Sequence, residues 1–160
     1  MEFETKYVTD VYNKIAPHFN NTRAYIWKDI KEFILDISKN GFLLEIGCGN
    51  GKNLLIRKDI ISVGIDITPN LLLICKQKDL DVSVANCIDL PYRDNIFSDS
   101  ISVAVIHHLS TKDKRIKALK EQIRITQSGG RCFLQVWGNI KKKPIKKYIP
   151  LENGEPGDYL

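Results

Sequence analysis

The stretch Leu43-Leu44-Glu45-Ile46-Gly47-Cys48-Gly49-Asn50-Gly51 decides the fold of this chain. The apolar run from Phe42 to Ile46 is typical of a buried parallel strand, and it changes abruptly into alternating glycines. Because glycine has no side chain, the backbone can turn sharply here and approach a ligand closely. Glu45 is a charge inside this apolar run, and we interpret it as a ligand contact.

A second acidic residue, Asp66, ends the next apolar stretch, Val63-Gly64-Ile65. An acid roughly 20 positions beyond a glycine loop is where nucleotide-binding α/β folds bind ribose hydroxyls. The spacing here is G-x-G-x-G, whereas dinucleotide folds have G-x-G-x-x-G. It suits a cofactor with a ribose and an amino acid but no pyrophosphate, so we predict S-adenosylmethionine. The alternative is a glycine turn in an α/β protein without a ligand.

Strands and helices alternate along the rest of the chain. The patterns predict strands at 42–46, 61–66, 82–85, 98–106 and 131–137, and helices at 5–19, 25–38, 52–58, 71–78 and 111–126. Pro17 and the polar residues after it are expected to end the first helix. This alternation predicts a parallel, doubly wound α/β sheet of order 3-2-1-4-5 with helices on both faces. The ligand is then expected at the carboxyl ends of strands one and four, capped by the two N-terminal helices.

Length and composition favour one domain over residues 1–160, with N-terminal helices to residue 40, a core over 41–138 and a basic tail over 139–160. No apolar stretch is long enough for a membrane span, and the acidic N-terminus is not a secretory signal. The four cysteines contain no C-x-x-C pair, which argues against a zinc site or a disulfide framework. We therefore expect no metal, a reducing compartment and a cytoplasmic protein, with the nucleus as a second location.

The net charge of +5 is unevenly distributed. Half of the 24 basic residues lie between Lys112 and Lys147, and only Asp113 and Glu121 oppose them there. A polyanion partner and a solvated lysine-rich surface both explain this pattern.

Four segments resemble the eukaryotic tRNA wobble-uridine methyltransferases. They are Val11–Arg23 with its Ile-Ala-Pro-His-Phe, Glu45–Lys52, Ile101–His108 with its Ala-Val-Ile-His-His, and Gly129–Arg131 with Val136-Trp137 after it. The resemblance runs from about Tyr7 to Trp137. It implies a Rossmann-like class I methyltransferase that esterifies 5-carboxymethyluridine in the anticodon of tRNA. Family members continue well past strand five, so the final antiparallel strands are expected to be missing here and the tail to be cut short.

The resemblance also implies the cofactor site. Glu45, Gly47, Gly49 and Gly51 are expected at the methionine end, with loop N–H groups facing its carboxylate. Asp66 and Ile67 are expected at the ribose, Asn86 and Cys87 (or Ile88) at the adenine, and Val103 at the end of strand four. The family usually has an aspartate at position 86, and Asn86 can still accept the adenine amino group through its carbonyl oxygen.

Two residues are assigned to the substrate. Arg23 is expected to hold the substrate carboxylate or a nearby phosphate. His108, with His107 beside it, is expected where the substrate enters, with one of the two pointing at the acceptor while its neighbour packs inward. A carboxylate with a pKa near ~4 is already ionised at neutral pH, so orientation rather than a general base is expected to drive transfer. Trp27 and Trp137 are expected in the core, although a base-stacking platform is the alternative.

Two partners follow from the resemblance besides the cofactor. The tRNA anticodon loop is expected to contact the basic Lys141–Lys147 cluster, and a small zinc-binding activator subunit is implied by the family. Strand three lies at a predicted sheet edge without lysine or proline, where an added strand can pair. Two other functions stay open: a methyltransferase that acts on a small molecule, and a truncated module that binds the cofactor without activity.

Overall fold

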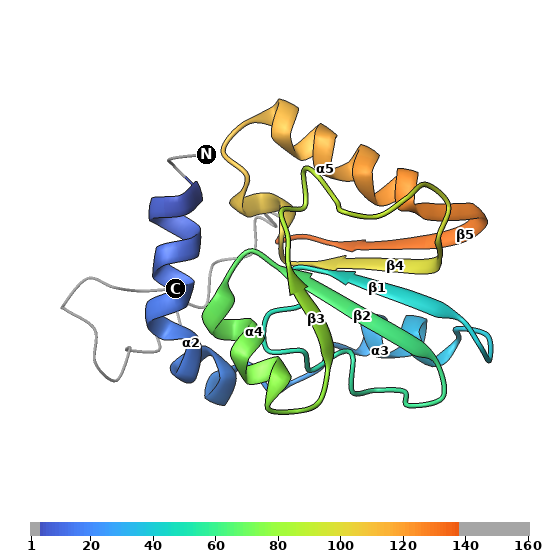
Figure 1. Ribbon diagram of the computed structural model, residues 1–160, viewed down its shortest axis with the longest axis horizontal. Coiled ribbons are helices and arrows are strands. Elements are labelled where there is room, and N and C mark those ends of the chain that lie inside the picture. The colour runs from blue at the N-terminus through green and yellow to red at the C-terminus, as the bar shows by residue number, and fades with distance from the viewer. Residues whose placement is uncertain (1–3, 138–160) are drawn as a thin grey trace, which may run out of the picture.

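The computed structural model describes residues 4–137 and contains a five-stranded parallel sheet of order β3-β2-β1-β4-β5 (Figure 1). The strands are β1 (Phe42–Ile46), β2 (Ile61–Asp66), β3 (Asp81–Val84), β4 (Phe97–Val103) and β5 (Thr126–Gln135). The helices are η1 (Thr5–Thr9), α2 (Asp10–Thr22), α3 (Lys28–Leu35), α4 (Pro69–Lys76), η2 (Ile106–His108) and α5 (Lys112–Ile125). The predicted doubly wound sheet and its strand order are confirmed.

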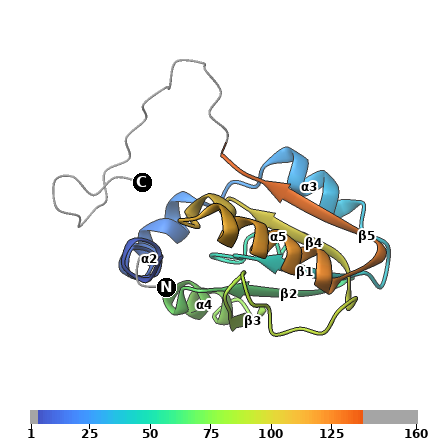
Figure 2. The same ribbon diagram turned by 90° about the horizontal axis from the view of Figure 1, so that it is seen from above.

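Alternating side chains of β1 build two separate cores. Leu43 packs with Ile30 and the other buried residues of α3, whereas Leu44 packs with Ile125 of α5. Successive strand residues point to opposite faces, so this alternation requires a helix on each face of the sheet. Figure 2 shows α3 and α5 on opposite sides of the sheet.

The end of β4 differs from the prediction. A strand was expected to continue to Ile106, but β4 ends at Val103, and Ala104 has a left-handed φ of 59°. Its N–H donates to the carbonyl of Gln135 at 2.8 Å. The reversal cannot be read from the apolar sequence, because a non-glycine residue rarely adopts this conformation. It turns the chain into η2, which carries both histidines of the pocket.

β5 begins earlier than predicted, at Thr126. The segment 128–130 was expected to form a turn before the strand, and it forms an irregularity within β5 instead. The register shifts between Phe97 and Asp99 of β4, and a Cβ on Gly130 would lie 2.5 Å from the carbonyl oxygen of Ser98. Glycine at position 130 therefore lets β5 return close to β4 after the shift.

The helix predicted at 52–58 is absent, since the structure has only turns there. Lys52 Nζ donates to the carbonyl of Tyr25 at 2.6 Å, and Asn53 Nδ2 donates to Glu45 Oε1 at 2.6 Å. Both side chains are engaged outside the segment, and these tertiary contacts outweigh its weak local helix preference.

One of the two N-terminal helices caps the pocket. α2 lies across the carboxyl ends of the strands (Figure 1), and Tyr12 and Phe19 from it line the pocket. The expectation was wrong for α3, which is shorter than predicted and packs through Ile30 and Ile34 on one face of the sheet. Trp27, the residue before α3, is the part of this segment that reaches the pocket.

Pro17 does not end α2, which continues to Thr22. Proline has no N–H, so the carbonyl of Asn13, four residues earlier, loses its helical partner. Asn70 Nδ2 donates to that carbonyl at 2.9 Å. In return, Asn13 Oδ1 accepts the backbone N–H of Asn70 at 3.1 Å, which caps the first turn of α4.

A second contact joins the end of α2 to the glycine loop. Asn20 Oδ1 accepts from Asn50 Nδ2 and from Lys78 Nζ, both at 3.2 Å, and Lys78 also donates to the carbonyl of Asn50 at 2.8 Å. The capping helix is therefore attached to the core at two places.

The tail at 139–160, including the Lys141–Lys147 cluster and the place where further strands were expected, lies outside the described residues. Among residues 4–137, no helix is long and apolar enough to cross a membrane.

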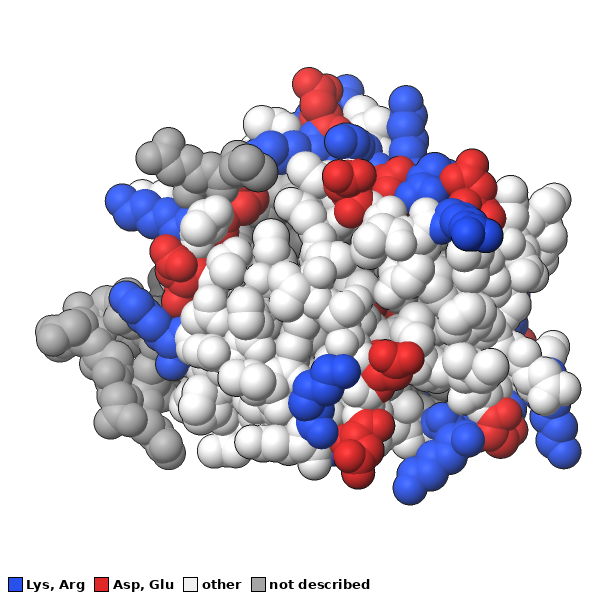
Figure 3. Space-filling view, viewed as in Figure 1, with Lys and Arg blue, Asp and Glu red and all other residues white. Residues whose placement is uncertain are grey.

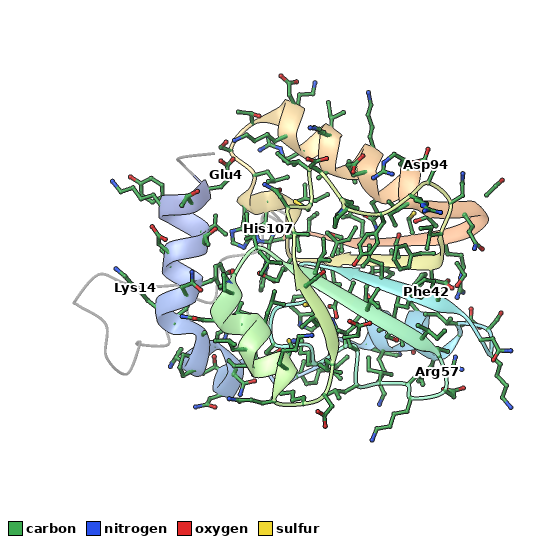
Figure 4. All side chains as sticks on the ribbon, viewed as in Figure 1. Glu4, Lys14, Phe42, Arg57, Asp94 and His107 are labelled. Atoms are coloured by element: carbon green, nitrogen blue, oxygen red, sulfur yellow. The ribbon has the colours of Figure 1, made fainter. Side chains whose placement is uncertain are left out.

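Replacing Asn13 by alanine should lower the free energy of unfolding by about 1 kcal/mol, since the α4 N-terminus loses its cap. Urea unfolding followed by circular dichroism measures this. Lys14→Ala is the matched control, because Lys14 is an exposed neighbour whose side chain points away from α4 (Figure 4). Equal stability of the two variants would contradict the capping role.

Candidate functional site

A pocket of about 730 Å³ opens at the carboxyl ends of β1, β2 and β4, beneath α2. Its volume lies within the usual range for small-molecule and cofactor sites. Every residue that the sequence assigned to cofactor or substrate lines it, except Gly51; these are Arg23, Glu45, Gly47, Gly49, Asp66, Ile67, Asn86, Cys87, Val103 and His108. The structure thus brings together residues from five separate segments, although their individual roles remain predictions.

The glycine loop after β1 needs glycine for its backbone and for its packing. Gly47, Gly49 and Gly51 all have positive φ, between 55° and 72°. A Cβ on Gly47 would lie 2.2 Å from Val105, and one on Gly51 would lie 2.4 Å from Leu80. Gly51 therefore packs against the protein interior, and Gly47 and Gly49 form the pocket wall.

The expectation that loop N–H groups face a ligand carboxylate was wrong for most of the loop. The N–H groups of Gly47 and Cys48 both donate to the carbonyl of Ile65, and Gly51 donates to Cys48. The Gly49 N–H donates to Asp66 Oδ2 at 2.9 Å. With these donors engaged inside the protein, a ligand carboxylate at this end would need side-chain cations.

Asp66 stands at the end of β2 and is 9% exposed. Its two carboxylate oxygens accept the backbone N–H groups of Gly49 and Thr68, each at 2.9 Å. Burial raises the pKa of this carboxyl, and these backbone hydrogen bonds oppose the rise. Each carboxylate oxygen can accept a further hydrogen bond, so Asp66 can still take the two hydroxyls of a ribose.

Glu45 lies on β1, is 1% exposed, and uses only one of its two carboxylate oxygens in hydrogen bonds within the described residues. Its Oε1 accepts from Asn53, whereas its Oε2 is buried and has no hydrogen-bond partner among the described residues. Burial raises the pKa of Glu45 to about 8, although the Asn53 hydrogen bond lowers it. An uncompensated buried carboxylate oxygen fits a cationic ligand group, such as the amino group of a methionine moiety.

The wall beyond Asp66 is formed by the segment after β3. Asn86 Oδ1 accepts the N–H of Ile88 at 3.2 Å, which orients its amide and leaves one lone pair for a ligand donor. Burial raises the pKa of the neighbouring Cys87 thiol to about 11, so this cysteine is neutral at physiological pH. An uncharged, half-buried wall of this kind suits a flat base such as adenine.

His108 is fixed by a tyrosine that the sequence analysis did not assign to the site. Tyr12 Oη lies 3.2 Å from His108 Nε2. Burial and the adjacent His107 lower the pKa of His108 to about 4, so the imidazole is neutral at pH 7. The expectation that one of the two histidines packs inward was wrong, because both line the pocket and His107 is exposed (Figure 4).

Arg23, Lys52 and two indoles also line the pocket. Arg23 follows α2, and Lys52 Nζ lies 5.6 Å from the ring centroid of Trp27. Trp27 packs against the α3 core as predicted. Trp137 does not belong to the core, since it is 71% exposed beyond the end of β5.

An ion pair ties the first described residues to the start of α5. Lys114 Nζ lies 2.7 Å from both carboxylate oxygens of Glu4, and Ser110 Oγ donates to Glu4 at 2.6 Å. These hydrogen bonds hold the pKa of Glu4 well below its usual range. Glu4 and Lys114 both line the pocket, so this contact forms part of its wall.

Taken together, the residues fit S-adenosylmethionine. Glu45 has an unpartnered oxygen for an ammonium group, Asp66 has lone pairs for ribose hydroxyls, and Gly49 keeps the loop free of side chains. Within residues 4–137, no cluster of histidine, cysteine and acidic residues could hold a metal ion.

The family model described as a methyltransferase domain matches residues 44–134, more than half of the chain. A tRNA (carboxymethyluridine(34)-5-O)-methyltransferase of Arabidopsis thaliana is 41% identical over 152 residues, which make up 94% of this chain and 38% of that protein. The enzyme of the same name in Saccharomyces cerevisiae is 33% identical over 138 residues, 85% of this chain and 50% of that protein. The chain therefore spans half or less of the length of these relatives.

Solved structures share the fold at lower identity. A methyltransferase in complex with the Haloferax volcanii Trm112 methyltransferase activator has a TM-score of 0.67 at 21% identity, covering 78% of this chain and 59% of that one. An S-adenosylmethionine-dependent methyltransferase of Thermotoga maritima has a TM-score of 0.61 at 20% identity, covering 79% of this chain and 60% of that one. The fold class predicted from the sequence is confirmed by these comparisons.

The buried Glu45 should make the stability of the ligand-free chain pH-dependent. Its carboxyl is ionised in the unfolded state above pH ~4.5 but stays protonated in the folded state up to about pH 8. Unfolding then releases a proton, so the free energy of unfolding falls as the pH rises. Between pH 6.5 and 8 this should amount to about 1.5 kcal/mol.

Urea unfolding at several pH values, compared with Glu45→Gln, measures this contribution. The variant keeps the shape of the side chain and loses the titration, so its stability should change less over this pH window. The window avoids His108, whose lowered pKa affects stability only below about pH 6.5. Parallel curves for the two proteins would refute the assignment.

Proposed function

The chain belongs to the methyltransferase-domain family, and from this premise we propose that it methylates the carboxylate of 5-carboxymethyluridine at the wobble position of tRNA. Support comes from the names of its relatives and from the residues that line the pocket. S-adenosylmethionine supplies a methyl group on a sulfonium, which an acceptor must approach in line with the sulfur.

The observation that carries the proposal is the shared pocket of Glu45, Arg23 and His108. Glu45 offers a buried carboxyl oxygen without a partner to the amino group of the cofactor, and Arg23 offers a planar cation for an acceptor carboxylate. The acceptor is ionised at neutral pH, so no base has to remove a proton. His108, neutral and oriented by Tyr12, can donate or accept one hydrogen bond at the acceptor without adding charge.

Rate enhancement then comes from orientation. Arg23 follows directly after α2, which is attached to α4 through Asn13 and to the glycine loop through Asn20. Because Arg23 is held in one position, it can orient the acceptor carboxylate toward the methyl group, so that the two reactants meet in a fixed geometry.

The tRNA itself would contact exposed lysines. Lys112, Lys117 and Lys120 are exposed on α5, the helix whose Lys114 lines the pocket. Phosphate contacts from such residues supply affinity without reading sequence. A role for the Lys141–Lys147 cluster stays a prediction, as does residence in the cytoplasm with the nucleus as a second compartment.

A small activator subunit is proposed to pair with β3. β3 lies on the edge of the sheet, and Val84 on it is 59% exposed, close to Leu73 of α4 at 61%. Figure 3 shows few charged side chains at the centre of the face over α4 and β3. An unprotected edge beside apolar surface is a pairing site for a strand from another protein.

The function can be tested by incubating the chain with tRNA that carries 5-carboxymethyluridine and with labelled S-adenosylmethionine, with and without a Trm112-type activator. The expected product is the methyl ester of the wobble nucleoside, found by mass spectrometry of the digested RNA. The activator should increase soluble yield and turnover. Transfer to small carboxylic acids but not to the tRNA would contradict the proposal and favour a small-molecule enzyme, and cofactor binding without any transfer would favour a silent module.

Arg23→Ala and His108→Ala should each reduce kcat/KM for tRNA about 100-fold, since each removes a contact to the acceptor. Calorimetry separates two roles for Arg23. If it holds the substrate carboxylate, the Kd of the cofactor stays unchanged in Arg23→Ala. If it holds the methionine carboxylate, that Kd rises, and the substrate assignment of Arg23 is wrong. Arg93→Ala serves as a control because Arg93 does not line the pocket.

A further inference from the structure

The two tryptophans of the chain form a narrow side cavity next to the cofactor pocket. The ring centroids of Trp27 and Trp137 are 5.8 Å apart at an interplanar angle of 82°. A cavity of about 190 Å³ is lined by these rings with Ala104, Gln135 and Val136. Both tryptophans and Ala104 also line the main pocket, so the two spaces adjoin.

One of the two indoles is open for stacking. Trp27 packs against the α3 core, and Lys52 Nζ lies over its ring, held at 2.6 Å by the carbonyl of Tyr25. Trp137 is 71% exposed. A flat ring that enters the cavity can therefore stack on Trp137, as nucleobases do on aromatic side chains.

Gln135 adds a polar contact inside this cavity. Its Oε1 is buried and has no hydrogen-bond partner among the described residues. Its backbone is fixed, because its carbonyl accepts the N–H of Ala104 at 2.8 Å. A buried acceptor without a partner is costly, so a ligand donor that meets this oxygen once the Gln135 side chain turns into the cavity would be favoured.

The size of the cavity limits the ligand. At the ~30 Å³ that a water molecule occupies in the liquid, 190 Å³ corresponds to roughly six waters. That is below the usual range for drug-sized ligands and suits one small ring. The space takes one nucleobase ring system and is too small for a whole nucleotide.

We propose that the Trp27–Trp137 cavity holds the pyrimidine ring of the methyl-accepting uridine, stacked on Trp137, with its N3–H donating to Gln135 Oε1. The proposal rests on the proposed function, because it names how that substrate is held. The carboxymethyl group on C5 then extends into the adjoining pocket toward Arg23 and His108. Trp137 and Gln135 thereby select a uracil, whose N3 is a donor, over a cytosine, whose N3 is an acceptor.

Tryptophan fluorescence tests this directly, because both tryptophans lie in the cavity and the chain has no others. The 160-residue chain, saturated with S-adenosylhomocysteine, is titrated with 5-carboxymethyluridine nucleoside. Saturable quenching is expected, with about tenfold weaker binding of the N3-methylated nucleoside, which lacks the donor. The Trp27→Phe background leaves Trp137 as the sole reporter. Absence of quenching, or equal quenching by adenosine, would overturn the proposal.

Two variants assign the contacts. Trp137→Ala should raise the KM for substrate tRNA about 10- to 100-fold, by the usual loss of one base-stacking contact. Gln135→Leu should abolish the preference for the nucleoside with a free N3–H. Leu134→Ala is the matched control, since Leu134 is the neighbour on β5 and lines neither pocket. Unchanged S-adenosylmethionine affinity and thermal unfolding must accompany both effects, so that misfolding is excluded.

These experiments distinguish the proposed uracil site from the proposed methyl-transfer reaction. Specific quenching without methyl transfer would refute the reaction and leave the uracil site standing. The opposite result would refute the uracil site and support the reaction. In that case the chain methylates tRNA, Trp137→Ala leaves the KM unaltered, and Gln135→Leu keeps the preference for a free N3–H.

Discussion

Two backbone hydrogen bonds to a single buried carboxylate hold the ligand-binding edge of this protein in shape. Asp66 accepts one N–H from the glycine loop after β1 and one from the residue that precedes α4. Both loops therefore keep a fixed distance from the end of β2, whether or not a ligand is present. The same carboxylate keeps lone pairs for ribose hydroxyls. The side chain that fixes these two loops is therefore also the one expected to bind the cofactor.

The position of the capping helix α2 depends on the loops that Asp66 orders. Asn13 shares two hydrogen bonds with Asn70, and Asn20 reaches both Asn50 of the glycine loop and Lys78. Because α2 is attached to segments that Asp66 already orders, Tyr12 and Arg23 are presented to the pocket from a well-defined position. The proline in the middle of α2 does not weaken it, because the freed carbonyl has found a partner on another helix.

Much of this could be read from the sequence, and the failures have physical causes. The strands, the glycine loop, Glu45 and Asp66 followed from apolar runs that end in glycine or in a carboxylate, since both signals are local. Arg23, Asn86 and His108 came from the family resemblance. The continuation of α2 through Pro17 depends on Asn70, which lies far away in the sequence. The helix predicted at 52–58 does not form, because Lys52 and Asn53 make hydrogen bonds to Tyr25 and Glu45 instead. Tyr12 was missed as a site residue and Trp137 was expected in the core, with a stacking platform only as the alternative, because an aromatic side chain in an apolar pattern carries no sign of whether it is buried.

The contact of Glu4 with Lys114 has a consequence for how firmly the N-terminal segment is held against the rest of the protein. It joins the residue before η1 to the start of α5, and both side chains line the pocket and remain partly in contact with solvent. Dissolved salt weakens partly exposed ion pairs. The attachment of η1 to α5, and with it the order of this part of the pocket wall, should therefore respond to ionic strength.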